Sequence, residues 1–168
     1  FCYLGRESLS RYQERRDEEL KINWQPFDLR HGKRNPDGTI DHSVDDGKDD
    51  DYYEQATQSV RRLQEQYDVD MELDLATDID SFDAQIAAYY VADHYPYETW
   101  LEFDEAIFDA LWQDGRDIGD ADVLADLADE VGVDAVEIQA ALDDEQLREE
   151  IEAEWTAAQR QGITGVPT

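Results

Sequence analysis

Apolar residues recur every three or four positions along most of this chain, which is the spacing of amphipathic helices. We expect a first helix from about Tyr3 to Glu18, and the chain is mainly helical from Tyr52 onward. The expected apolar faces of the later helices are Tyr53, Ala56, Val60, Leu63 and Tyr67; Ala84, Ala87, Tyr90, Val91 and His94; Trp100, Phe103, Ile107 and Leu111; Val123, Leu124, Leu127 and Val131; and Leu147, Ile151, Trp155 and Ala158. In the third of these helices, apolar residues extend over most of the circumference, so two surfaces should cover it.

Capping residues mark where several of these helices should begin. Ser81 is placed to cap the helix that follows it. Asp134 with Glu137, and Asp143 with Gln146, have the spacing of capping boxes, in which each side chain binds the other residue's backbone N–H. Each pattern predicts a helix start with local backbone donors satisfied by side chains.

Strand signals are few. Leu20, Ile22 and Trp24 alternate with polar residues up to Pro26, which predicts one half-buried or edge strand, and residues 71–75 alternate over a shorter length. A strand without ladder partners cannot make a stable sheet, so the sheet of this chain should be incomplete. Residues 30–50 have no apolar period and predict a long loop, which is either disordered or a lid.

The formal net charge is −30, from 44 acidic and 14 basic residues. Such a chain repels nucleic acid and anionic membranes, because both are bound through Lys and Arg. No run of about 18 apolar residues is present, so no segment is expected to span a membrane. We interpret the charge as the surface of a halophilic protein that needs salt for screening. Local disorder and a calcium site at residues 45–51 are alternatives, but these residues lack the twelve-residue spacing of a calcium loop.

Cys2 is the only cysteine, which excludes an intrachain disulfide and a cysteine-rich zinc site. We expect surface positions for His31, His42 and His94, and no metal or cofactor. Cys2 lies where the first helix should begin, so the positive end of the helix dipole should favour its thiolate. An inert, buried cysteine is the alternative.

Both ends of the chain match motifs of one protein family. The residues from Phe1 to Gly5, Phe-Cys-Tyr-Leu-Gly, resemble the end of the run Cys-Pro-x-Cys-Tyr-Leu-Gly in DsbA-like oxidoreductases of the FrnE type. Gly165-Val166-Pro167 resembles the loop of that family whose proline is cis and faces the cysteines. Residues 24–29 are similar to the second strand of the family, and residues 157–162 to the end of the helix before the proline loop.

The resemblance covers nearly the whole chain and implies an α/β, thioredoxin-like fold with an incomplete sheet and a large inserted all-helical domain. The expected parts are a thioredoxin-like segment at 1–50, a helical insertion at 51–142 and a second thioredoxin-like segment at 143–168. It also implies truncation at both ends, because the first cysteine of the motif, the strand before it and everything after the proline are absent from the printed chain.

The resemblance further implies a thiol-disulfide oxidoreductase that acts on cysteine-containing proteins or small thiols. Cys2 would be its resolving thiol, and Phe1, Tyr3, Val166 and Pro167 would bind substrate. We expect no nucleic-acid or membrane partner and a cytoplasmic location. One alternative is a relative of 2-hydroxychromene-2-carboxylate isomerases or kappa-class glutathione transferases, in which Ser replaces the first cysteine and the site binds a thiol cofactor. Another is a non-enzymatic acidic helical binding module.

Overall fold

The computed structural model describes residues 1–18, 20, 22–36, 38–45, 47–75 and 79–167. By their contacts, the residues fall into two units, which are described separately below. Unit 1 comprises Phe1–Met71 and Ile163–Thr168, and unit 2 comprises Glu72–Gly162. The domain boundaries expected from the sequence, at 50/51 and 142/143, differ from these limits and stay a prediction about folding units.

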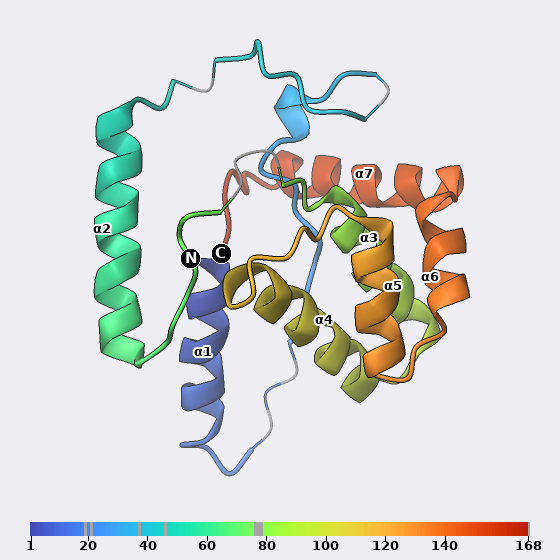
Figure 1. Cartoon of the computed structure of the whole chain (residues 1–168), viewed down its shortest axis with the longest axis horizontal. Coiled ribbons are helices and arrows are strands. Elements are labelled where there is room, and N and C mark those ends of the chain that lie inside the picture. The colour runs from blue at the N-terminus through green and yellow to red at the C-terminus, as the bar shows by residue number, and fades with distance from the viewer. Residues whose placement is uncertain (19, 21, 37, 46, 76–78, 168) are drawn as a thin grey trace. The chain divides into compact units, whose positions relative to one another are not determined.

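Unit 2 is a bundle built around one central helix. Its helices are α3 (Phe82–His94), α4 (Tyr97–Trp112), α5 (Ala121–Glu130), α6 (Ala135–Leu142) and α7 (Glu145–Arg160). Helix α3 contacts each of the other four (Figure 1). Helix α4 contacts both α3 and α5, which confirms that two surfaces cover it.

The core of unit 2 consists of side chains that lie at helical spacing in the sequence. Five of the most fully enclosed are Phe103, Ile86, Leu124, Ile138 and Trp155. Burying side chains of this size is worth about 1.5–3 kcal/mol each. The hydrophobic effect therefore holds this unit together despite its charge.

The helix starts in unit 2 differ in detail from the predicted caps. Ser81 occupies the N-cap position of α3, but its side chain makes no capping bond, and the amide of Phe82 donates to Asp80 Oδ1 at 3.2 Å. Helix α7 is capped by Asp144, one residue beyond the expected Asp143. Ser81 was therefore predicted correctly as the N-cap residue, although Asp80 offers the carboxylate, whereas the prediction of Asp143 as a cap was wrong, because Asp144 caps α7 instead.

The capping box at α6 forms only in half. Asp134 Oδ1 accepts a bond from the amide of Val136 at 2.8 Å, as a cap should. Glu137 instead accepts bonds from the hydroxyls of Tyr95 (2.8 Å) and Tyr90 (3.2 Å). The Asp134 amide donates to the Tyr95 hydroxyl at 3.1 Å. A tertiary polar network therefore replaces the reciprocal bond and joins the end of α3 to the start of α6.

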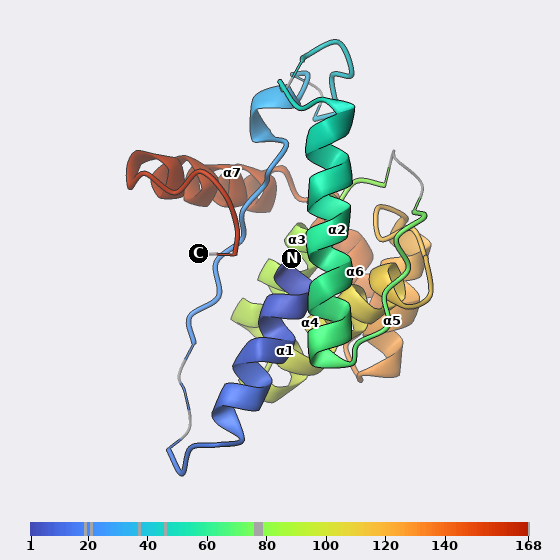
Figure 2. The same cartoon turned by 90° about the vertical axis from the view of Figure 1, so that its left-hand side faces the viewer.

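Unit 1 contains two α-helices among its described residues, α1 (Cys2–Gln13) and α2 (Asp50–Tyr67), and a short 3-10 helix η1 (His31–Lys33). Helices α1 and α2 contact each other and lie side by side in Figure 2. Helix α1 ends five residues before the expected Glu18. Of the described residues in this unit, only Leu4 and Asp28 are buried.

The strand expected at residues 20–25 is wrong in the residues that can be judged. Residues 20 and 22–28 are irregular, residues 71–75 are irregular too, and Lys21 lies outside the described residues. Alternation alone cannot make a strand, because each strand needs a neighbour to pair its backbone groups. No β-strand occurs in the part of the chain that the structure describes, so the incomplete sheet is not confirmed.

Part of the long loop is ordered by a buried ion pair. Asp28 Oδ2 accepts a bond from Arg34 Nε at 2.6 Å, and the two side chains are 2% and 7% exposed. Arg34 also donates to the carbonyl of Gly38 at 2.8 Å, and forms an antiparallel bridge with Ile40. Among the described residues 28–36 and 38–40, these contacts join Asp28, Arg34, Gly38 and Ile40 into a turn. No helix of the described residues is long and apolar enough to cross a membrane.

Candidate functional site

Cys2 is the first residue of α1. The amide of Gly5 donates to the carbonyl of Phe1 at 2.8 Å, which closes the first helical turn, and no side chain caps this end. The thiol of Cys2 is free and half-buried. Leu4, two positions later, is 1% exposed. The first turn of α1 therefore presents one partly enclosed thiol.

Burial raises the pKa of the Cys2 thiol. The amino group of Phe1 and the backbone N–H of Cys2 itself act in the opposite direction, but their effect is smaller. Desolvation thus acts against the helix dipole that was expected to favour the thiolate, and the expectation of a ready thiolate at Cys2 stays a prediction. A half-buried thiol of raised pKa is a poor attacking group at neutral pH.

Pro167 packs against the same helical turn. A Cβ atom added at Gly5 would lie 3.5 Å from Cγ of Pro167, in ordinary van der Waals contact. The Val166–Pro167 peptide bond is cis, as expected. The structure thus brings Cys2 and Pro167, 165 positions apart in sequence, to one turn of α1. Phe1 is 47% exposed, and Tyr3 and Val166 are half-buried.

Arg6 follows Cys2 by one helical turn and stacks on an aromatic ring. Its guanidinium carbon lies 5.6 Å from the centre of the Trp24 ring. This distance is within the range of a cation–π interaction. The irregular segment that contains Trp24 is therefore held at the face of α1 that bears Cys2.

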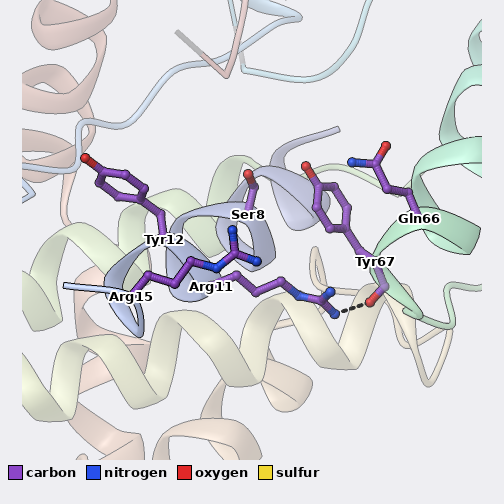
Figure 3. Close-up of a pocket in the computed structure, with 6 residues that line it drawn as sticks. All are labelled: Ser8, Arg11, Tyr12, Arg15, Gln66 and Tyr67. Atoms are coloured by element: carbon purple, nitrogen blue, oxygen red, sulfur yellow. Dashed lines mark hydrogen bonds between the residues drawn. The ribbon is translucent and has the colours of Figure 1, made fainter.

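A groove runs along the other half of α1. It has a volume of about 340 Å³ and is lined by Ser8, Arg11, Tyr12, Arg15, Gln66 and Tyr67 (Figure 3). Cys2 is not one of the lining residues. The sequence analysis did not identify this site, because its two walls are over fifty positions apart. The available signal was the shared helical face of Ser8, Tyr12 and Arg15.

The described residues contain no group of three His, Cys, Asp or Glu side chains that could hold a metal ion. The calcium alternative concerned residues 45–51, of which Asp46 lies outside the described part of the chain. His94 Nδ1 lies 2.9 Å from the carbonyl of Tyr90, and the two rings stack with centroids 4.1 Å apart. His94 therefore packs against Tyr90 at the end of α3.

A family model described as DSBA-like thioredoxin domain matches residues 1–168. The chain belongs to this family. It is also 27% identical over 169 residues to the uncharacterized protein YwbO of Bacillus subtilis, covering all of this chain and 79% of that protein.

Two solved structures have the same fold. A 2-hydroxychromene-2-carboxylate isomerase superposes with a TM-score of 0.78 and 19% identity, over 99% of this chain and 77% of that one. A probable DsbA oxidoreductase from Streptomyces coelicolor superposes with a TM-score of 0.74 and 19% sequence identity, and the match covers 99% of this chain and 73% of that one. The thioredoxin-like fold of the family is therefore shared, although the described residues display only its helical part.

Proposed function

We propose that this protein is a thiol-disulfide oxidoreductase in which Cys2 is the resolving thiol. The supporting observation is the half-buried Cys2 at the first turn of α1, where the ring of Pro167 also packs. Membership of the DSBA-like thioredoxin domain family gives this arrangement its redox interpretation. The raised pKa of Cys2 suits a group that acts second, after a more exposed thiol has attacked.

The proposed reaction needs two thiols. A thiolate three residues before Cys2 attacks a substrate disulfide and releases one substrate thiol, which leaves a mixed disulfide. Cys2 then loses its proton and attacks the sulfur of the first cysteine. This step releases the second substrate thiol and leaves a protein disulfide. Two electrons pass from protein to substrate, and in the oxidising direction the same steps run backward.

Phe1, Tyr3, Val166 and Pro167 are the proposed contacts for the substrate. Phe1 is exposed beside the thiol, and Tyr3 and Val166 are half-buried. The backbone of Val166 would pair with an extended peptide by strand addition, in which main-chain bonds give affinity with little dependence on sequence. The substrates would therefore be cysteine-containing proteins or small thiols.

The test compares three forms of the chain as catalysts of insulin reduction by dithiothreitol, which returns the protein disulfide to the dithiol after each turnover. The first is the 168-residue chain, the second is extended by Cys-Pro before Phe1, and the third is extended by Ser-Pro as the matched control. We expect catalysis only from the Cys-Pro form. Adding Cys2→Ser to that form should trap mixed disulfides, visible on non-reducing gels.

Two outcomes would contradict this assignment. If the 168-residue chain reduces insulin as fast as the Cys-Pro form, Cys2 is the attacking thiol. If the Cys-Pro form is folded but inert, the oxidoreductase proposal is wrong.

The second candidate function, glutathione-dependent isomerisation or transfer, is favoured by the fold shared with the isomerase at a TM-score of 0.78. It predicts activity from the Ser-Pro form with glutathione present.

A further inference from the structure

The groove between α1 and α2 has an unusual composition for this chain. Acidic residues outnumber basic ones by 44 to 14, yet all six residues that line the groove are cationic or neutral. Two are arginines, three carry hydroxyls and one is an amide. Its volume of about 340 Å³ is large enough for several water molecules, each of which occupies about 30 Å³.

The two arginines have different roles. Arg11 is held by the structure: its Nε lies 2.5 Å from Glu7 Oε1, and its guanidinium donates to the carbonyl of Tyr67 and stacks on that ring at 5.4 Å. It therefore fastens α1 to the end of α2, and its charge is balanced by Glu7. Replacing Arg11 should alter the walls of the groove as well as its charge.

Arg15 makes no side-chain bond of this kind. Its backbone N–H donates to Tyr12, but no carboxylate of the described residues lies within ion-pair distance of its guanidinium. Figure 3 shows this guanidinium turned toward the space between Ser8 and Tyr67. Its position just past the end of α1 also suits the helix dipole, but that interaction leaves the guanidinium donors unused.

Hydroxyl groups complete the lining. The Tyr12 hydroxyl accepts a bond from Arg16 at 2.8 Å, and Figure 3 shows it directed away from Ser8 and Tyr67, so Tyr12 lines the groove without donating into it. Ser8 and Gln66 are exposed and add further donors at the rim. A guanidinium surrounded by neutral donors matches the oxygen atoms of a carboxylate or a phosphate, which form short charge-assisted bonds.

We propose that the groove binds a small-molecule oxyanion, a phosphate or a carboxylate, with Arg15 as the main anchor and Ser8 and Gln66 as secondary donors. The site lies along α1 beyond Cys2: Ser8 is six residues further, about 9 Å along the helix axis at 1.5 Å per residue. It is independent of the proposed thiol chemistry.

The experiment is isothermal titration calorimetry with inorganic phosphate and, separately, with succinate, at an ionic strength held constant with KCl. Wild-type protein should give saturable one-site binding with at least one of the two anions. Arg15→Ala should weaken that binding about tenfold or more, which corresponds to 1.4 kcal/mol. Arg15→Lys should retain part of it, because the charge remains while the bidentate fork is lost.

The matched control is Arg61→Ala, which removes one charge from an exposed position of α2 outside the groove. We expect unchanged affinity. Ser8→Ala tests the site without changing the charge and should weaken binding severalfold. Amide shifts in NMR spectra should concentrate at Ser8, Tyr12 and Tyr67.

Three results would overturn the proposal. They are no saturable binding of either anion, an equal loss in Arg15→Ala and Arg61→Ala, and shifts located away from the groove. The titration involves no thiol, so it fails or succeeds independently of the redox assignment.

Discussion

The two units of this chain differ in both packing and charge. Unit 2 contains 27 acidic and three basic residues, a net charge of −24, but has a continuous apolar core. Unit 1 contains 17 acidic and 11 basic residues, a net charge of −6, and Leu4 is the only buried apolar side chain among its described residues. The comparison teaches that stability and candidate chemistry are separated: unit 2 supplies the core, and unit 1 supplies the thiol and the groove.

The way their helices are secured differs as well. In unit 2, helices α5, α6 and α7 each begin with an aspartate whose side chain accepts backbone bonds. In unit 1, Asp49 caps α2 in the same way, but α1 has no side-chain cap and 18-residue α2 has no buried residue. Contacts such as that of Arg11 with Tyr67 hold these helices. Unit 1 should therefore open more easily than unit 2.

The largest expected effect tests this contrast in packing. Phe103→Ala, at a fully buried position of α4, should lower the free energy of unfolding by about 3–5 kcal/mol. Tyr53→Ala, at a position of α2 that is 52% exposed, should change it by about 0.5 kcal/mol or less. Urea unfolding at constant KCl measures both. Equal losses would contradict the claim that stability resides in unit 2.

Salt should stabilise the protein through the charge on unit 2. The screening length falls from about 10 Å at 0.1 M to about 3 Å at 1 M salt, so repulsion among the 27 acidic residues weakens. We expect the midpoint of circular-dichroism melts to rise with KCl, and hydrogen exchange to slow more in unit 2 than in unit 1. A midpoint that stays constant or falls would contradict the halophilic interpretation.

The buried ion pair should matter locally in unit 1. Asp28→Asn removes the carboxylate that Arg34 Nε contacts at 2.6 Å, and breaking a buried pair typically costs about 3–5 kcal/mol. Because unit 1 has little core, we expect the loss of the ion pair to speed proteolysis between residues 28 and 40 and to change the free energy of global unfolding little. Asp70→Asn, an exposed residue, is the control. Unchanged proteolysis would show that the pair does not order the loop.

Sequence reasoning succeeded where one helix face determines the outcome. Phe103, Ile107 and Trp155 were placed on apolar faces by spacing alone and are buried. It failed where the outcome depends on a distant partner. The alternation of Leu20, Ile22 and Trp24 predicted a strand, but a strand also needs a neighbouring strand, and none occurs among the described residues.

Dependence on partners distant in sequence also explains why the bonds of Glu137 and the groove were not predicted. Glu137 has the spacing of a capping box but binds two tyrosines from α3 and the loop after it, which no local pattern encodes. The candidate thiol site followed from motifs at both ends of the chain. The groove combines α1 with the end of α2, so only tertiary structure could reveal it.

The network at Glu137 gives a smaller effect within unit 2. Burial and the bond to Glu137 raise the pKa of Tyr90, so Glu137→Gln should move this pKa back toward its ordinary value. A tyrosine of raised folded pKa favours folding below its unfolded pKa, and this contribution is lost as pH rises through the folded value. Tyrosine titration by carbon-13 NMR measures the shift. The loss of stability near neutral pH should be about 1 kcal/mol.

Glu102→Gln, at an exposed position of α4, is the matched control for this change. It should leave the pKa of Tyr90 and the stability unchanged. A shift of Tyr90 in the control but not in Glu137→Gln would mean that general field effects, rather than this bond, determine the pKa.

The smallest effect concerns Cys2, the thiol of the less packed unit. Because burial raises its pKa, alkylation of the folded chain by iodoacetamide should reach half its maximal rate at a higher pH than alkylation of the chain unfolded in guanidinium. The folded form is then the slower one at neutral pH, and the difference should close once the pH exceeds the folded pKa. If the pKa of the folded thiol is instead lower than that of the unfolded thiol, the dipole at the start of α1 has a larger effect than desolvation. Cys2 would then suit an attacking role better than a resolving one.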